Sequence, residues 1–244
     1  MERAALDQLP GFRRRFRVTP LAGSVRTEVE DDYHSMSVIM HHVGGIATSI
    51  VAVMHRAPWT TCPGAVQQLE QTFTGVRLSE FAERGEKRSN CTHLHDLATL
   101  GAAHAVDTQP LVYDILVSDS IEGRREAELR RNGVPVLQWT LAGFRLLEPT
   151  DLAGLTLDKL SPWIATLEPQ QQEEARVLRW GSMIANGRAI PLEQQSDAMR
   201  MPVGNCYTFQ PQRRGEALRV GEIRDFSRGT AEPLAERRAL GELS

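Results

Sequence analysis

Histidine is the residue type whose distribution in this chain points most directly to chemistry. All seven histidines lie between His34 and His104. Imidazole exchanges protons near neutral pH, so a pocket with several histidines supplies a general acid and a general base. We predict that His34, His93 and His95 are catalytic, and we interpret the remaining histidines as bystanders: His41, His42, His55 and His104.

Two cysteines at the N-termini of predicted helices form the second candidate feature. Cys62 lies in the first turn of one helix, and Cys91 opens the segment Cys91-Thr92-His93-Leu94-His95-Asp96 at the start of another. A helix N-terminus has unpaired N–H groups and a positive dipole end, which lower the pKa of a thiol. If the two helices pack side by side on a sheet, we expect Cys62 and Cys91 to meet His34 and His93 or His95 at one rim.

Three further residues supply groups that could bind a substrate. Arg56 could hold a carboxylate with two parallel hydrogen bonds, and we count it with the catalytic residues as well. Tyr33 and Trp59 could stack on an aromatic ring. Nucleotide, nicotinamide and flavin motifs are absent from the sequence. These groups favour a lyase that cleaves C–C bonds of small aromatic or other organic acids, as in aromatic catabolism; isomerisation and hydrolysis stay open.

These side chains must be positioned by a sheet and two helices. Alternation over residues 33–40 and 46–54, with Gly44-Gly45 between them, predicts a β-hairpin. Helices are predicted from Thr60 or Thr61 to Gly75 and over 91–106. Further strands are expected over residues 111–117, 125–131 and 134–147, the last two joined by Asn132-Gly133, and residues 1–30 are expected to form an edge strand after a loose start.

Helical patterns over residues 155–160 and 169–187 follow the last predicted strand. We therefore predict an α+β fold of antiparallel hairpins and a meander with two helices packed on the sheet. Residues 1–150 are expected to form this core domain. Residues 151–244 are expected to form a helical extension with an irregular end that packs on the core.

Composition narrows the class of protein. The 244 residues carry a net charge of -3, which gives no reason to expect a nucleic-acid or membrane-surface partner. Three cysteines and the absence of a recognisable targeting segment predict a reduced, cytoplasmic protein. The edges left by an antiparallel sheet favour a homodimer. A small-molecule substrate is the expected partner.

Two family resemblances rest on particular stretches of the sequence. The chain resembles the bacterial family of unknown function 2889 in residues 33–36 and 44–46, in Gly75, and most specifically in residues 56–65 and 91–98. More distantly, the order hairpin, Gly-Ile, cysteine before a helix, glycine, cysteine before a helix looks like the NifU-type iron-sulfur scaffold domain. That second resemblance implies a scaffold-like core and cysteine ligands for a metal.

The scaffold pattern is incomplete in this chain. Pro63 and Gly64 follow the first cysteine, Asn90 precedes the second, and the third cysteine, Cys206, lies more than a hundred residues downstream. The alternative hypothesis is therefore a metal or iron-sulfur binding and transfer protein, in which Cys62, Cys91 and a histidine such as His93 hold Zn or Fe. A structural or interaction module without chemistry is a third hypothesis.

Overall fold

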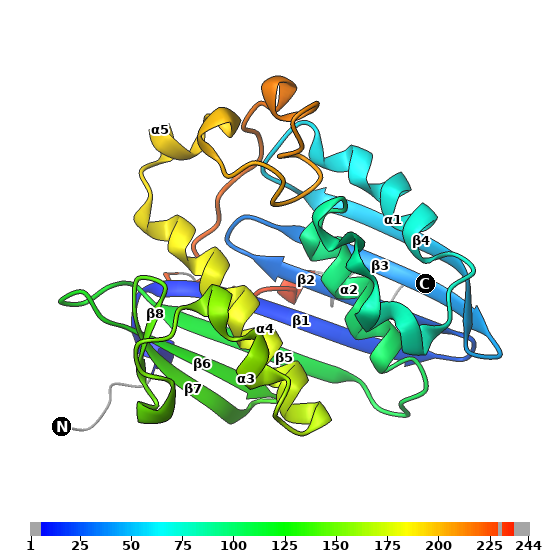
Figure 1. Cartoon of the computed structure of the whole chain (residues 1–244), viewed down its shortest axis with the longest axis horizontal. Helices are drawn as coiled ribbons and strands as arrows, with labels where there is room; N and C mark the ends of the chain where they lie inside the picture. The colour runs from blue at the N-terminus through cyan, green and yellow to red at the C-terminus, as the bar shows by residue number, and fades with distance from the viewer. Residues whose placement is uncertain (1–5, 229–230, 237–244) are drawn as a thin grey trace. The chain divides into compact units, whose positions relative to one another are not determined.

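The computed structural model describes residues 6–228 and 231–236. Over these residues the protein is an α+β fold, with eight strands in an antiparallel sheet and a few helices (Figure 1). The strands are β1 Gly11–Leu21, β2 Ser24–Asp31, β3 Ser35–Val43, β4 Ile46–Arg56, β5 Leu111–Ser118, β6 Arg125–Arg131, β7 Val134–Ala142 and β8 Arg145–Glu148. The α-helices are α1 Ala65–Phe73, α2 Thr92–Ala103, α3 Ser161–Ile164, α4 Pro169–Ala185 and α5 Leu192–Gln195.

The chain divides into two compact units, and β1 contributes residues to both. The first unit comprises Met1–Arg15, Val112–Pro191 and Asp225–Ser244, and the second comprises Phe16–Leu111 and Leu192–Arg224. The strand order is β4-β3-β2-β1-β5-β6-β7-β8. The domain boundary expected after residue 150 lies within the first unit, between β8 and α4.

The second unit contains the predicted hairpin and both predicted helices. Strands β3 and β4 pair antiparallel and are connected by a turn at Gly44 and Gly45, which have φ angles of +58° and +75°. Glycine occupies such angles without a steric penalty, so this turn forms where the sequence places it. Helices α1 and α2 pack on this hairpin and on β2, with Leu69 and Leu97 fully buried. This arrangement confirms the predicted hairpin and helix pair.

The edge-strand prediction for residues 1–30 is wrong. The segment forms β1 and β2, and β1 lies between β2 and β5 in the strand order. Its apolar residues Phe12 and Phe16 are buried at 0% and 1% exposure. Arg17 on β1 forms an ion pair of 2.6 Å with the buried Glu28 on β2. Because partners neutralise such charges, an arginine-rich strand can be central.

The first unit contains β5 to β8 and the longest helix. Asn132 and Gly133 form the predicted turn between β6 and β7, and both have positive φ angles. The strand predicted over residues 134–147 is divided into β7 and β8 by a turn in which Gly143 has a φ of +58°. Helix α4 packs on β6 and β7 and begins with a capping box at Glu168.

Gly181 on α4 gives a stability prediction for this unit. A Cβ atom at this position would lie 2.6 Å and 2.7 Å from the Cγ2 and Cδ1 atoms of Ile115 on β5. Overpacking in the Gly181→Ala variant should lower the unfolding free energy by about 1–3 kcal/mol. The higher helix propensity of alanine, about 1 kcal/mol, offsets only part of this loss. Urea denaturation measures the change. Met183→Ala, at an exposed position of the same helix, is the control; a stabilised Gly181→Ala variant would contradict the close packing.

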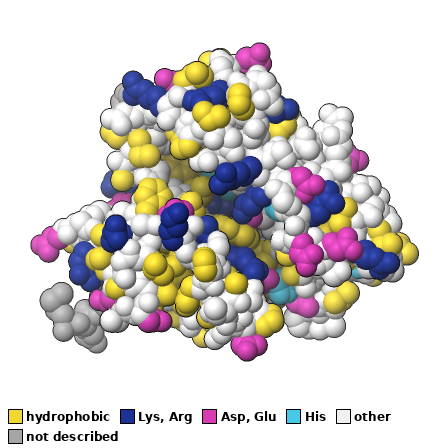
Figure 2. Space-filling view, in the orientation of Figure 1, with side chains coloured by type: hydrophobic (Ala, Val, Ile, Leu, Met, Phe, Trp, Pro, Cys, Tyr) yellow, Lys and Arg dark blue, Asp and Glu magenta, His cyan; other side chains and the backbone are white. Residues whose placement is uncertain are grey.

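On the face drawn in Figure 2, basic and acidic side chains are both spread over the surface, in keeping with the net charge of -3. Within the part of the chain that the structure describes, no helix is long and apolar enough to cross a membrane.

Candidate functional site

The candidate site is built on the turn between β2 and β3 in the second unit. The Oδ1 atom of Asp31 accepts hydrogen bonds of 2.8 Å from the backbone N–H groups of Tyr33 and of His34. The backbone N–H of Asp31 donates to the carbonyl of His34 at 2.9 Å. An aspartate side chain that bonds the backbone two and three residues ahead stabilises a tight turn. Asp31 therefore fixes the backbone that carries His34.

The same carboxylate also holds the His34 imidazole. Nδ1 of His34 lies 2.9 Å from Oδ1 and 3.2 Å from Oδ2 of Asp31, and the two residues are 6% and 0% exposed. An ionised carboxylate can only accept, so in the neutral imidazole Nδ1 carries the proton and Nε2 presents a lone pair. Among the described residues, none forms a hydrogen bond with Nε2 of His34. The turn thus presents a proton acceptor with a fixed tautomer.

His93 lies directly against His34. The two imidazole rings are stacked, with centroids 3.9 Å apart and an interplanar angle of 29°. His93 is the second residue of α2, whose N-cap is Cys91, and it is half-buried. The Cys91 Sγ atom lies 3.9 Å from Nδ1 of His93. The structure therefore brings together His34 and His93, two of the histidines selected from the sequence.

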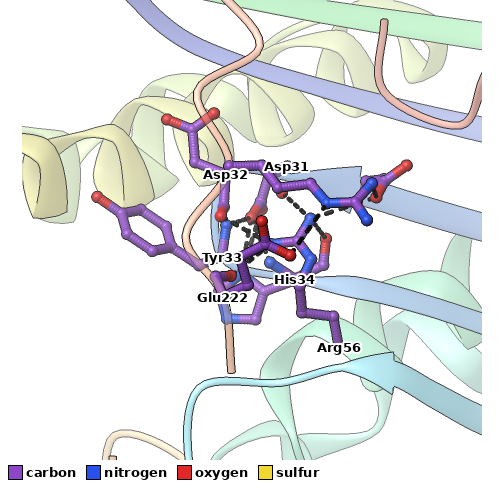
Figure 3. Close-up of polar contacts among 8 residues, drawn as sticks. Asp31, Asp32, Tyr33, His34, Arg56 and Glu222 are labelled. Carbon is purple, nitrogen blue, oxygen red and sulfur yellow. Dashed lines mark hydrogen bonds and ion pairs between the residues drawn. The ribbon is translucent and has the colours of Figure 1, made fainter. Parts of the chain in front are cut away.

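Arg56 at the end of β4 supports the turn from beneath (Figure 3). Its two terminal nitrogens donate to the carbonyl oxygens of Asp31, Asp32, His34 and Glu222 at 2.6 to 3.3 Å, and to Glu30 Oε1 at 3.2 Å. A substrate carboxylate would have to displace these acceptors. In this structure Arg56 positions the turn that holds His34.

One aromatic candidate, Tyr33, lies in the turn itself, and the other, Trp59, follows β4. The Tyr33 ring stands edge-on to His34, with centroids 6.2 Å apart. Trp59 follows β4 and is 4% exposed in an apolar cluster that includes Cys62 and Phe209. The guanidinium of Arg219 lies over both aromatic rings, 5.8 Å from the Tyr33 centroid and 5.6 Å from the Trp59 centroid. The aromatic pair is thus joined to the site through a residue that sequence reasoning did not select.

The cysteines differ from the expectation of lowered thiol pKa values. Cys62 begins a 3-10 turn before α1, and burial raises its pKa despite a contact of 3.4 Å with Thr208 Oγ1. Burial also raises the pKa of Cys91 strongly, and the neighbouring thiols Cys62 and Cys206 add to the effect. Loss of water around the thiols therefore outweighs the helix termini.

No close metal-binding arrangement involves these thiols in the described part of the chain. There, the group of three ligand atoms within 4.8 Å of one another comes from Asp31, His34 and His93. The set Cys62, Cys91 and His93 does not form such a group, and Cys62 packs in an apolar cluster. Oxygen and imidazole donors replace sulfur as the candidate ligands.

The raised thiol pKa values predict slow alkylation. Thiolate is the reactive species, and its fraction at a given pH falls tenfold for each unit by which the pKa rises. We expect Cys62 and Cys91 to react with iodoacetamide at pH 7 far more slowly than the same thiols in the unfolded chain. Mass spectrometry of peptides from native and urea-treated protein measures both rates. Rapid native labelling of Cys91 would contradict the burial.

His95 lies away from the site. It is 4% exposed on α2, and its ring packs on Phe73 of α1 with centroids 5.0 Å apart. Burial, and to a smaller extent the charge of Lys87, lowers the pKa of His95 to about 4. In the described part of the chain, Nε2 of His95 is buried without a hydrogen-bond partner. His95 is thus held neutral in the packing of the helix pair.

Sequence reasoning missed Asp31 and Arg219. Asp31 has a local signal, because an aspartate before Asp32-Tyr33-His34 at the end of an alternating strand is typical of a side-chain-capped turn. Arg219 has no such signal: it lies in a segment of weak periodicity, and its partner segment is about 160 residues away in sequence.

Comparisons with known proteins give no match: no family model, curated protein or solved structure is similar to this chain at a significant level.

Proposed function

We propose that the protein is an enzyme that acts by general acid and base catalysis on a small organic acid, with His34 as the base. The observation that carries this proposal is the buried Asp31–His34 pair, whose Nδ1–H is held by a carboxylate while Nε2 lacks a partner among the described residues. A structural histidine in a core usually has both ring nitrogens satisfied or buried. A positioned carboxylate behind an imidazole is the arrangement that stabilises the imidazolium formed by proton abstraction.

C–C bond cleavage is the reaction class that we favour. In a retro-aldol cleavage, Nε2 of His34 accepts the proton of a β-hydroxyl group and the C–C bond breaks. One fragment leaves as an aldehyde, and the other keeps the electron pair of the broken bond. His93, stacked on His34 at 3.9 Å, is placed to return a proton to that carbon. Two adjacent imidazoles thus cover both proton transfers without an external oxidant or reductant.

A substrate panel tests this proposal. Aromatic carboxylic acids with a β-hydroxyl or a β-keto group are incubated with the purified protein, and aldehyde and carbon dioxide are measured. We expect at least one acid to be cleaved by the wild type and cleavage to be lost in His34→Gln and strongly reduced in His93→Gln. His41→Gln, at an exposed position on β3, is the control. Full turnover in both the His34 and the His93 variants would refute the assignment.

The alternative proposal is a metal-binding protein or metalloenzyme. It is supported by the three ligand atoms of Asp31, His34 and His93 within 4.8 Å, because two imidazoles and a carboxylate are a common donor set for Fe or Zn. The nearly parallel rings weigh against it, because imidazole lone pairs lie in the ring plane and stacked rings do not aim them at one point. His93 would have to turn to bind an ion.

Metal analysis distinguishes a metal-free enzyme from a metal-binding protein. It also tests the proposal that Cys62 and Cys91 belong to a scaffold-like core that transfers Zn, Fe or an iron-sulfur cluster. Protein purified anaerobically is analysed for Zn and Fe before and after chelation. A bound structural metal contributes several kcal/mol to folding, so its removal should lower the melting temperature. Metal lost in Asp31→Ala supports the histidine site, and metal lost in Cys62→Ala supports the thiol site. Metal-free protein of unchanged stability would refute both.

A further inference from the structure

Arg219 is held in place by a short ladder between two distant segments of the second unit. The backbone N–H of Thr60 donates to the carbonyl of Leu218 at 3.0 Å, and that of Val220 donates to Pro58 at 2.9 Å. Trp59 and Arg219 form the antiparallel bridge between these bonds. The ladder directs the guanidinium over the Trp59 and Tyr33 rings. Arg219 is therefore a positioned side chain on a paired backbone.

The charge of Arg219 has no counter-ion within the described part of the chain. The guanidinium is half-buried, yet no carboxylate there forms an ion pair with it and no acceptor takes its hydrogen bonds. Burial lowers its pKa, and the opposing contributions come from Tyr33 and Cys62 rather than from an acidic residue. Three other shielded arginines have carboxylate partners: Arg15 with Asp114, Arg17 with Glu28 and Arg56 with Glu30. The buried Arg125 instead donates to the Gly143 carbonyl and to Oδ1 of Asn186.

An unpaired, partly desolvated guanidinium is a binding site for an anion. Its planar fork matches a carboxylate, and the interaction strengthens where water is partly excluded. The two aromatic faces stabilise the cation while its N–H edge stays available. The Tyr33 ring is close to both groups, because its centroid is 5.8 Å from the guanidinium carbon of Arg219 and 6.2 Å from the His34 centroid.

We propose that Arg219 binds the carboxylate of a small organic acid, so that the molecule extends along Tyr33 toward Nε2 of His34. This inference rests on the proposed function for its second half, the placement of the reacting bond, but the anion site itself does not depend on catalysis. Carboxylate binding, which the sequence suggested for Arg56, is thereby assigned to Arg219. The N–H groups of Arg56 already donate to acceptors of the turn and to Glu30.

Binding of benzoate, with benzamide as its uncharged counterpart, tests the anion site. Isothermal titration calorimetry on the full chain should show benzoate binding to the wild type, at least about tenfold weaker binding to Arg219→Gln, and an intermediate affinity for Arg219→Lys. Arg213→Gln is the matched control, because Arg213 also lies over an aromatic ring, Tyr207 at 3.9 Å. It should bind benzoate as the wild type does.

The outcomes separate this proposal from the proposed function. Benzoate binding that is equal in the wild type and in a folded Arg219→Gln variant would overturn the anion site, as would equal binding of benzoate and benzamide by the wild type. His34→Gln should still bind benzoate. If the substrate panel shows no turnover while Arg219→Gln loses benzoate, the anion site stands and the enzymatic proposal fails. If an acid is cleaved and Arg219→Gln leaves its KM unchanged, the Arg219 assignment fails and catalysis stands.

Discussion

Replacement of Asp31 by Asn should lower turnover of a cleaved acid by about 10²- to 10⁴-fold, the range in which positioned acid and base groups contribute to catalysis. The amide oxygen of Asn can still accept the two backbone bonds of 2.8 Å that fix the turn. It carries no charge, however, so it cannot stabilise an imidazolium at His34. The fold should be retained while the base is weakened. Steady-state kinetics together with circular dichroism measure the two effects.

The chain offers a matched control for this variant. His104 and Asp107 form a second aspartate–histidine pair three residues apart, directly after the end of α2, with Nδ1 and Oδ2 separated by 2.7 Å. Asp107→Asn should leave turnover unchanged. An Asp31→Asn variant that is folded and fully active would show that the buried carboxylate has no catalytic role.

The second large effect is an acid destabilisation caused by His95. In the folded protein, burial lowers the pKa of His95 to about 4 from its ordinary value of 6.5. Below pH 6.5, His95 therefore binds a proton in the unfolded chain but stays neutral in the folded chain. The unfolding free energy falls as the pH decreases, and this loss is complete below about pH 4. At about 1.4 kcal/mol per pKa unit, the unfolding free energy should fall by about 3 kcal/mol between pH 7 and pH 4 from this residue alone.

Comparison of pH profiles isolates the contribution of His95 from that of the carboxylates. Urea denaturation is measured at pH 4, 5.5 and 7 for the wild type, for His95→Leu, and for His41→Gln as an exposed control. The His95→Leu variant should lose about 3 kcal/mol less than the wild type over this range. Parallel profiles for the wild type and His95→Leu would contradict a neutral buried imidazole.

Local patterns explain which parts of the fold were predictable. Gly44-Gly45 and Asn132-Gly133 specify their turns through backbone angles that few other residues adopt, so both hairpins follow from a few neighbouring residues. The central position of β1 does not follow, because the charge of Arg17 is neutralised there by Glu28, a residue of the next strand. The strand predicted over residues 134–147 was too long because the turn at Gly143 interrupts a continuous alternating pattern.

The candidate site was predictable only in part, for similar reasons. The proximity of His34 and His93 follows from one hairpin and one helix N-terminus, both of which have local signals. The direction of the cysteine pKa shifts depends on how much water the thiols lose, which the spacing of residues does not specify. Arg219 reaches the site through a long-range ladder with Trp59, and local periodicity carries no information about such pairs.

The tautomer of His34 tests the central claim most directly and requires no substrate. In protein labelled with ¹⁵N-histidine, two-dimensional NMR at neutral pH distinguishes a protonated Nδ1 from a protonated Nε2, and the His34→Gln spectrum assigns the signal. The hydrogen bond from Nδ1 to Asp31 predicts that His34 carries its proton on Nδ1 and that Nε2 is the unprotonated nitrogen, an arrangement disturbed in Asp31→Asn. A neutral His34 with its proton on Nε2 would contradict the account, because the nitrogen that must accept the substrate proton would already hold one.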